Sequence, residues 1–204
     1  MPAVLLGTPG NAYKRKNCRY VDGQTQPAGT CVAVPSPGGF GLGIDLNRNY
    51  GALWGGPGAS GDRTSATYRG PAPFSEPETQ NVKELVSERQ VTNLITNHTF
   101  SNLILRPPGI RAQGPSPDEP AYKALGDAMA AQNGYASQRG YELYDTTGTT
   151  EDWSFWTAGG LGFTFEIGPS NFHPPFAEMV AEYEGTTAAA DAQGNGGGNR
   201  AAYF

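Results

Sequence analysis

The sequence predicts an α/β fold, a mixed sheet flanked by helices. Apolar segments with the length and composition of strands alternate along the chain with segments of helical spacing, and that alternation is typical of this class. The predicted strands are residues 91–95, 103–105 and 163–167. The predicted helices are residues 75–86, 119–132 and 174–184.

The first predicted helix has a clear start signal. Ser75 stands as a possible N-cap, Glu78 follows three residues later, and Pro77 falls in the first turn. Beyond this start, apolar residues recur with the three- and four-residue spacing of a helix face, at Val82, Leu85 and Val86.

The other two helices are predicted from periodicity. The helix over 119–132 places four residues on one side, namely Ala124, Leu125, Ala128 and Met129. In the helix over 174–184 we expect four side chains to be buried, namely Phe176, Met179, Val180 and Tyr183. Residues 141–150 are expected to form a polar turn.

Composition bounds the class of protein. The chain has 204 residues with 29 Gly and 17 Pro, which predicts many irregular loops around one large domain. We expect that domain over residues 1–184 and a Gly/Ala-rich linker or tail over 185–204. The net charge of −5 argues against a nucleic-acid partner, and no apolar run reaches the length of a membrane span. The N-terminus lacks the pattern of a signal peptide.

Cys18 and Cys31 are the two cysteines of the sequence, and they flank a polar loop. A disulfide between them would stabilise the fold by about 2–3 kcal/mol and would indicate an oxidising compartment. The alternative is two free thiols.

The segment 43–51 combines two apolar residues with a polar cluster. Alternation of Ile44 and Leu46 with polar residues predicts a short strand that ends in Asn47, Arg48 and Asn49. A guanidinium beside two carboxamides is a good receptor for a carboxylate, because the planar fork donates two parallel hydrogen bonds. The alternative is an ordinary polar turn.

Three further residues are candidates for chemistry. Glu166 interrupts an apolar strand, where an ionised carboxylate is costly unless it has a partner or a function. His98 follows the end of the strand over 91–95, and a strand end is a place where a ligand or catalytic group would be presented. Tyr144 begins a loop that could close over a ligand. A structural histidine and an ordinary loop tyrosine are the alternatives for the last two.

Together these segments resemble the zinc carboxypeptidase family, the metallocarboxypeptidases like carboxypeptidase A. The matching elements are Lys14-Arg-Lys16, Asp45-Leu-Asn-Arg-Asn49, His98, Tyr144 and Phe163-Thr-Phe-Glu166, in the family's order. The resemblance extends from about Tyr13 to Glu184, and it implies a carboxypeptidase-like fold that lacks the first strands of the family domain.

The resemblance implies a reaction and a role for each matching residue. It implies zinc-dependent hydrolysis of the C-terminal peptide bond of peptides or proteins, with Glu166 as general base and Arg15 as the residue that stabilises the oxyanion. His98 would be a zinc ligand.

The remaining matches imply contacts with the substrate. Asn47 and Arg48 would hold the terminal carboxylate, and Tyr144 would cap the terminal residue. Glu151 would lie at the base of the specificity pocket, where it would suit a C-terminal Lys or Arg, although apolar neighbours would equally suit apolar residues. Asp45 would support a zinc-bound histidine.

The match lacks the family's first zinc motif, His-x-x-Glu. The chain has two histidines, His98 and His173, and neither is followed by Glu three residues later. A catalytic zinc ion needs three protein ligands. We therefore expect an N-terminally truncated domain that is inactive as given, although its family is secreted and zinc-dependent. The alternative is a non-catalytic module that binds peptide C-termini. We also expect self-association through an exposed sheet edge.

Overall fold

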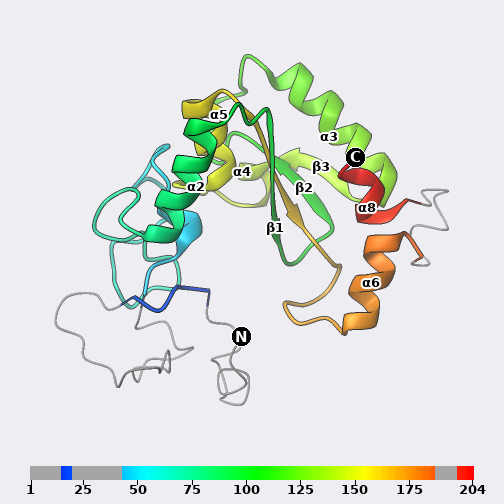
Figure 1. Cartoon of the computed structure of the whole chain (residues 1–204), viewed down its shortest axis with the longest axis horizontal. Helices are drawn as coiled ribbons and strands as arrows, with labels where there is room; N and C mark the ends of the chain where they lie inside the picture. Colours follow the sequence, from blue (N-terminus) through cyan, green and yellow to red (C-terminus); the bar gives the residue numbers. More distant parts are fainter. Residues whose placement is uncertain (1–14, 20–42, 187–196) are drawn as a thin grey trace. The chain divides into compact units, whose positions relative to one another are not determined.

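A computed structural model describes residues 15–19, 43–186 and 197–204 of the chain (Figure 1). It divides into two compact units, each described by itself below. Unit 1 contains the described residues up to Val91 together with Asp145–Ala158, and unit 2 contains Thr92–Tyr144 and Gly159–Phe204. No described helix is both long and apolar enough to cross a membrane.

Unit 1 is mostly irregular. Its regular elements are η3 (Leu46–Arg48), α2 (Pro77–Glu88) and α5 (Thr150–Ala158). An aromatic cluster stabilises it, because Trp153 of α5 lies 5.7 Å from Tyr50 and 5.5 Å from Phe74, measured between ring centroids. The abundance of Gly and Pro thus gives long loops that are held by a few buried rings.

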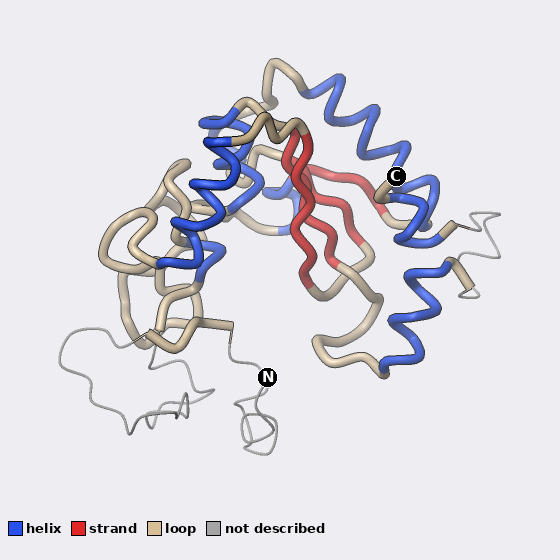
Figure 2. Tube along the Cα trace, viewed as in Figure 1, coloured by secondary structure: helices blue, strands red, loops and turns tan. Residues whose placement is uncertain are grey.

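Unit 2 contains a four-stranded mixed sheet. Its strands are β1 (Asn93–His98), β2 (Leu103–Arg106), β3 (Ala136–Arg139) and β4 (Leu161–Glu166), in the order β1-β4-β2-β3. β4 is parallel to β1 and antiparallel to β2, and β2 is parallel to β3. Figure 2 shows the strands in red and the helices in blue. The predicted mixed sheet of an α/β fold is confirmed.

The helices of unit 2 are η4 (Arg111–Gln113), α3 (Glu119–Asn133), α4 (Gly140–Leu143), α6 (Phe176–Glu184) and α8 (Gly198–Ala202). α3 packs on β2 and β3, and close approach is possible because residue 126 is glycine: a Cβ there would lie 2.4 Å from Ser137 Oγ. Tyr122 of α3 is fully buried, stacks on Phe163, and donates its hydroxyl to the Gly160 carbonyl. The buried face of α3 therefore makes a hydrogen bond as well as apolar contacts.

Several predicted elements are confirmed and others need correction. The helix expected over 119–132 is α3, and the strands expected over 103–105 and 163–167 are β2 and β4. The N-cap of α2 lies one residue later than expected, at Glu76 and not at Ser75. The expected turn over 141–150 is wrong at both ends, where α4 and α5 lie.

The predicted burial along the last long helix is wrong. α6 forms as expected, but it contains no buried residue, and Phe176 is 84% exposed. Helical spacing of apolar residues shows which side chains share a face, and it does not show that the face has a partner.

Part of the segment expected as a linker is helical. Residues 187–196 lie outside the described part, whereas α8 packs against α3 and α6. Asn199 of α8 is buried and accepts a hydrogen bond from Asn133, and its own amide donates to the hydroxyl of Tyr135. A polar network therefore fixes this short helix in unit 2.

The partly buried carboxylate of Glu119 links α3 to β2 and β3. Glu119 at the start of α3 accepts hydrogen bonds from Arg106, at 2.8 Å from Nη2, and from Arg139, at 3.1 Å from Nε. Burial alone would raise the pKa of Glu119, but the hydrogen bonds and charges of these two arginines outweigh it and lower the pKa below its ordinary value.

Replacing Glu119 with Gln is expected to destabilise the chain by about 3 kcal/mol at neutral pH, because it leaves the buried Arg106 guanidinium without a counter-charge. The lowered pKa means that this contribution is fully present above the pKa of the unfolded carboxyl and is lost as the pH falls below it. Urea unfolding, monitored by far-UV circular dichroism, measures the free energy of unfolding. The difference in this free energy between wild type and variant should decrease from pH 7 toward pH 3. Asp127→Asn on the exposed side of α3 is the matched control, and an equal loss in both variants would contradict the prediction.

Candidate functional site

The segment 45–48 folds as a turn, and the predicted strand is wrong there. Asp45 is the N-cap of η3, and its Oδ1 accepts the backbone N–H of Asn47 at 3.3 Å. Asp and Asn side chains bond the backbone two residues ahead, and here this local bond prevails over the apolar–polar alternation. Because the segment is a turn, the side chains of Asn47 and Arg48 do not point to opposite faces as they would in a strand.

Arg48 is a buried cation of unit 1. Its side chain is almost fully buried, and it donates from Nε to the Gly58 carbonyl at 2.8 Å and from Nη1 to the Asn47 carbonyl at 2.6 Å. Its Nη2 makes no hydrogen bond to the described residues. Two carbonyls therefore fix the plane of the guanidinium and leave one terminal nitrogen for a ligand.

Asn47 ties this turn to the start of α5. Its Oδ1 accepts from the backbone N–H of Thr150 at 3.1 Å and from the Thr150 hydroxyl at 3.2 Å. The next residue is Glu151, which is 6% exposed and whose Oε2 has no hydrogen-bond partner among the described residues. The structure thus brings three of the predicted site residues, Asn47, Arg48 and Glu151, to one region of unit 1.

Asn49 does not belong to the predicted carboxylate receptor. It is 0% exposed, and its amide donates to the carbonyls of Arg69 and Ala72 and to Ser75 Oγ, at 2.9–3.0 Å. Its Oδ1 accepts from the hydroxyl of Thr79 at 2.8 Å. All of its polar atoms are therefore used inside the protein, and the second carboxamide of the predicted receptor is structural.

Arg15 lies against the same turn. Its Nε is 3.0 Å from Asp45 Oδ2, an ion pair that lacks hydrogen-bond geometry, and Oδ2 has no hydrogen bond to the described residues. The Arg15 side chain is 38% exposed. A guanidinium that is held at one end and open to solvent at the other could meet a developing negative charge.

Lys16, the next residue, points inward. Its Nζ donates to the carbonyls of Arg63 and Ser65, at 2.6 and 3.1 Å. Burial lowers the pKa of Lys16 to about 8, against the opposing effect of the Asp45 and Asp62 carboxylates, which raise it.

The Lys16 amine is expected to titrate with a midpoint near pH 8. Between this value and the ordinary lysine pKa the unfolded chain binds one proton more than the folded chain, so stability relative to Lys16→Met should rise with pH across that interval. Dimethylation with ¹³C-formaldehyde and NMR would follow the titration, and the signal is identified by its absence in Lys16→Arg. A midpoint at the ordinary lysine value would contradict the burial argument.

In unit 2, the sheet brings His98 and Glu166 together. They are the last residues of the parallel strands β1 and β4, and they stand opposite each other in the register. The Glu166 side chain is almost fully buried, and His98 is partly buried. Because carboxyl ends of neighbouring parallel strands meet at one edge of a sheet, this edge is where functional groups of α/β folds gather.

Tyr144 caps the end of α4. Its backbone N–H donates to the Gly140 carbonyl at 3.4 Å, and its side chain is 48% exposed. Tyr144, His98 and Glu166 belong to unit 2, whereas Arg15, Asn47, Arg48 and Glu151 belong to unit 1.

The donor set of the described residues does not make a complete zinc site. No three His, Cys, Asp or Glu side chains within these residues are grouped to hold a metal ion. His98 is the one predicted ligand, and His173 is an exposed loop residue whose N–H donates to Asn171. A catalytic zinc ion needs three protein ligands, so we derive no step through a metal here.

Sequence reasoning missed two parts of the site. Thr150 orients Asn47, and α5 places Glu151 beside it. The one available signal was Thr150 followed by two acidic residues and Trp153, a helix start that is hidden by the preceding Thr and Gly residues.

The profile of the zinc carboxypeptidase family matches residues 10–189. The chain belongs to the zinc carboxypeptidase family. Carboxypeptidase A1 of Mus musculus is 32% identical over 71% of this chain and 37% of the relative's length. Carboxypeptidase O of Bos taurus is 31% identical over 71% of this chain and 42% of its own length.

Two solved structures share this fold over most of the chain. The carboxypeptidase A of Helicoverpa armigera matches 84% of this chain and 44% of its own, with a TM-score of 0.63 at 22% identity. Bovine thrombin-activatable fibrinolysis inhibitor, solved in complex with tick carboxypeptidase inhibitor, matches 79% of this chain and 56% of its own, with a TM-score of 0.64 at 25% identity. The chain therefore spans less than half the length of the curated relatives it matches.

Proposed function

We propose that this chain carries the terminal-residue receptor and the general base of a zinc-dependent carboxypeptidase that cleaves the last peptide bond of peptides and proteins. The observation that carries the proposal is the Arg48 guanidinium, buried and fixed by two carbonyls with Nη2 left over. A buried cation with an unused donor favours an anionic ligand, since burial removes the water that would otherwise compensate it.

The receptor selects a chain end. Only a C-terminal residue carries a carboxylate at the position where Arg48 Nη2 donates, and Asn47 lies next to it on the same turn. Internal peptide bonds lack that charge, and the residue types therefore favour an exopeptidase over an endopeptidase.

Glu151 sets the preference for the terminal side chain. Its buried Oε2 lacks a partner among the described residues, and a carboxylate in that condition favours a guanidinium or ammonium group. We therefore propose a preference for C-terminal Arg or Lys over apolar residues.

Glu166 is the proposed general base, and Arg15 the proposed oxyanion ligand. A buried carboxylate at a strand end would take a proton from the attacking water and would later deliver it to the leaving amine. The exposed end of the Arg15 guanidinium would donate to the tetrahedral oxyanion, and Tyr144 would cover the bound residue. Of the three protein ligands that a catalytic zinc ion needs, the described residues offer one predicted ligand, His98.

Binding of short acylated peptides to the chain tests the receptor. A peptide ending in Arg with a free carboxylate should bind at least about tenfold more tightly than its C-terminal amide, a difference of about 1.4 kcal/mol. The same peptide ending in Leu should bind more weakly than the Arg peptide. Isothermal titration calorimetry measures all three, and equal affinity for acid and amide would refute the receptor.

Zinc titration and peptide hydrolysis test the catalytic part. Release of the terminal residue that requires zinc and is lost in Glu166→Gln would support Glu166 as the base. Full activity of Glu166→Gln would exclude that role and would leave the receptor result intact.

Secretion, a disulfide and self-association are further proposals. Secretion would accompany a disulfide between Cys18 and Cys31, but Cys31 lies outside the described residues, and the pairing stays a prediction. Self-association would use an edge of the sheet, where β1 has β4 as its neighbour among the described strands. Sedimentation velocity should then show a rising mean mass as the chain is concentrated, and a constant monomer mass would contradict it.

A further inference from the structure

The segment 15–19, which carries Arg15, is held to the rest of unit 1 at Asn17. The backbone N–H of Asn17 donates to the Ile44 carbonyl at 2.9 Å, and its Oδ1 accepts the Ile44 N–H at 2.8 Å. The segments that contain Asn17 and Gly43 approach each other so closely that a Cβ at Gly43 would lie 1.9 Å from the Asn17 carbonyl oxygen. Gly43 also has a φ of +78°. A second contact comes from Lys16, whose Nζ donates to the carbonyls of Arg63 and Ser65 at 2.6 and 3.1 Å.

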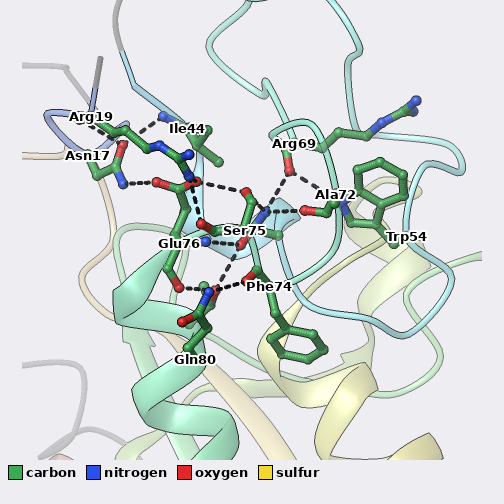
Figure 3. Close-up of polar contacts among 12 residues, drawn as sticks. Asn17, Arg19, Ile44, Trp54, Arg69, Ala72, Phe74, Ser75, Glu76 and Gln80 are labelled. Atoms are coloured by element: carbon green, nitrogen blue, oxygen red, sulfur yellow. Dashed lines mark hydrogen bonds and ion pairs between the residues drawn. The ribbon is translucent and has the colours of Figure 1, made fainter. Parts of the chain in front are cut away.

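The buried carboxylate of Glu76 provides a third contact. Its side chain is 0% exposed, its Oε2 accepts from the Asn17 amide at 2.7 Å, and its Oε1 accepts from Arg19 Nη1 at 2.6 Å (Figure 3). Ser75 Oγ donates to Oε1 at 2.7 Å. Two of these three donors come from the segment that carries Arg15.

Burying a carboxylate is costly unless hydrogen bonds or positive charges compensate it. The groups that contact Glu76 therefore indicate its role. Glu76 occupies the N-cap position of α2, a twelve-residue helix, yet its side chain makes no capping hydrogen bond. The nearby helix N-terminus favours a negative charge there. The charge is directed instead at Asn17 and Arg19, with hydrogen bonds of the short, charge-assisted kind.

We propose that Glu76 is a positioning residue, which fixes the segment 15–19 and through it the Arg15 guanidinium beside Asp45. Arg15 needs this support, because its one ion pair to Asp45 lacks hydrogen-bond geometry and its side chain is half-exposed. That Arg15 is an oxyanion ligand rests on the proposed function. That Glu76 holds the Arg15 guanidinium beside Asp45 does not depend on it.

The test follows the Nε–Hε signal of Arg15 in ¹H–¹⁵N spectra of the chain, identified by its absence in Arg15→Lys. In Glu76→Gln, an NH2 donor replaces one of the two carboxylate oxygens and the negative charge is removed, so either Asn17 or Arg19 loses its acceptor. The Arg15 signal should move toward that of a solvent-exposed arginine and exchange faster with water, while signals of β4 and α3 stay in place. Glu78→Gln, an exposed carboxylate in the first turn of the same helix, is the matched control and should leave the Arg15 signal unchanged.

Two milder variants keep the proposal open to refutation if Glu76→Gln unfolds unit 1. Asn17→Ala and Arg19→Met each remove one donor to Glu76, and the Arg19 side chain is half-exposed. Each should shift the Arg15 signal in the same direction. An unchanged Arg15 signal in a folded Glu76→Gln, or in both milder variants, would overturn the proposal.

Peptide binding separates this inference from the proposed function. The preference for acid over amide should survive in Glu76→Gln, because Gly58 and Asn47 carbonyls hold Arg48 independently of segment 15–19. A wild-type chain without that preference would refute the proposed receptor, and the Arg15 signal would still decide the role of Glu76.

Discussion

Replacing Arg48 with Gln is expected to weaken the binding of a free C-terminal carboxylate by roughly 30- to 1000-fold, or about 2–4 kcal/mol. The loss is large because Arg48 is buried, so water cannot take over the missing charge. Arg48→Lys should fall between wild type and Arg48→Gln, since an ammonium keeps the charge without the planar fork that the Gly58 and Asn47 carbonyls orient.

Calorimetric titration with the acylated Arg peptide and its amide measures the change. Arg69→Gln is the matched control: it removes one positive charge from the same unit, where Arg69 packs over Trp54 and donates to the Gly55 carbonyl. Affinity for the amide should change little in either variant. A Gln variant that is folded and keeps its preference for the acid would show that the carboxylate is held elsewhere.

Replacing Asn49 with Ala is expected to destabilise unit 1 by about 3–5 kcal/mol. The amide group of Asn49 connects three segments of a loop-rich unit, through the carbonyls of Arg69 and Ala72 and the hydroxyls of Ser75 and Thr79. Alanine removes all four of these hydrogen bonds, each of which contributes about 1 kcal/mol. The Ser75 and Thr79 hydroxyls keep Glu76 as a partner, and the Arg69 carbonyl keeps Trp54.

Tryptophan fluorescence isolates this effect, because the three tryptophans of the chain, Trp54, Trp153 and Trp156, all belong to unit 1. Urea titration should show a lower midpoint for Asn49→Ala, whereas Asn81→Ala on the exposed side of α2 should match wild type within about 0.5 kcal/mol. Equal midpoints for the two variants would show that the Asn49 network is dispensable.

The central elements of unit 2 could be predicted from the sequence, whereas β3, α4 and α8 were not predicted. The apolar segments that became β2 and β4 and the periodic segment that became α3 are strong local signals, and local pattern and tertiary packing agree there. The site residues His98 and Glu166 stand at strand ends, and a parallel register then places them opposite each other.

Unit 1 was less predictable, since its elements are short and its order comes from contacts distant in sequence. Ile44 and Leu46 fit a strand pattern, but Asp45 bonds the following backbone and makes a turn. α5 was missed because the Thr- and Gly-rich stretch before it matches a loop, while its first turn is held by Asn47, more than one hundred residues away in the chain.

The sequence by itself determined the family, the class of fold and the residue types available for chemistry, because these depend on local pattern and on ordered motifs. Tertiary structure alone decided which polar groups are enclosed within the protein. Asn47 and Asn49 are the same residue type two positions apart, yet Asn49 is enclosed by four partners, whereas Asn47 bonds the start of the helix that carries Glu151. Composition cannot separate them, since the difference is the burial and hydrogen bonding that distant segments impose.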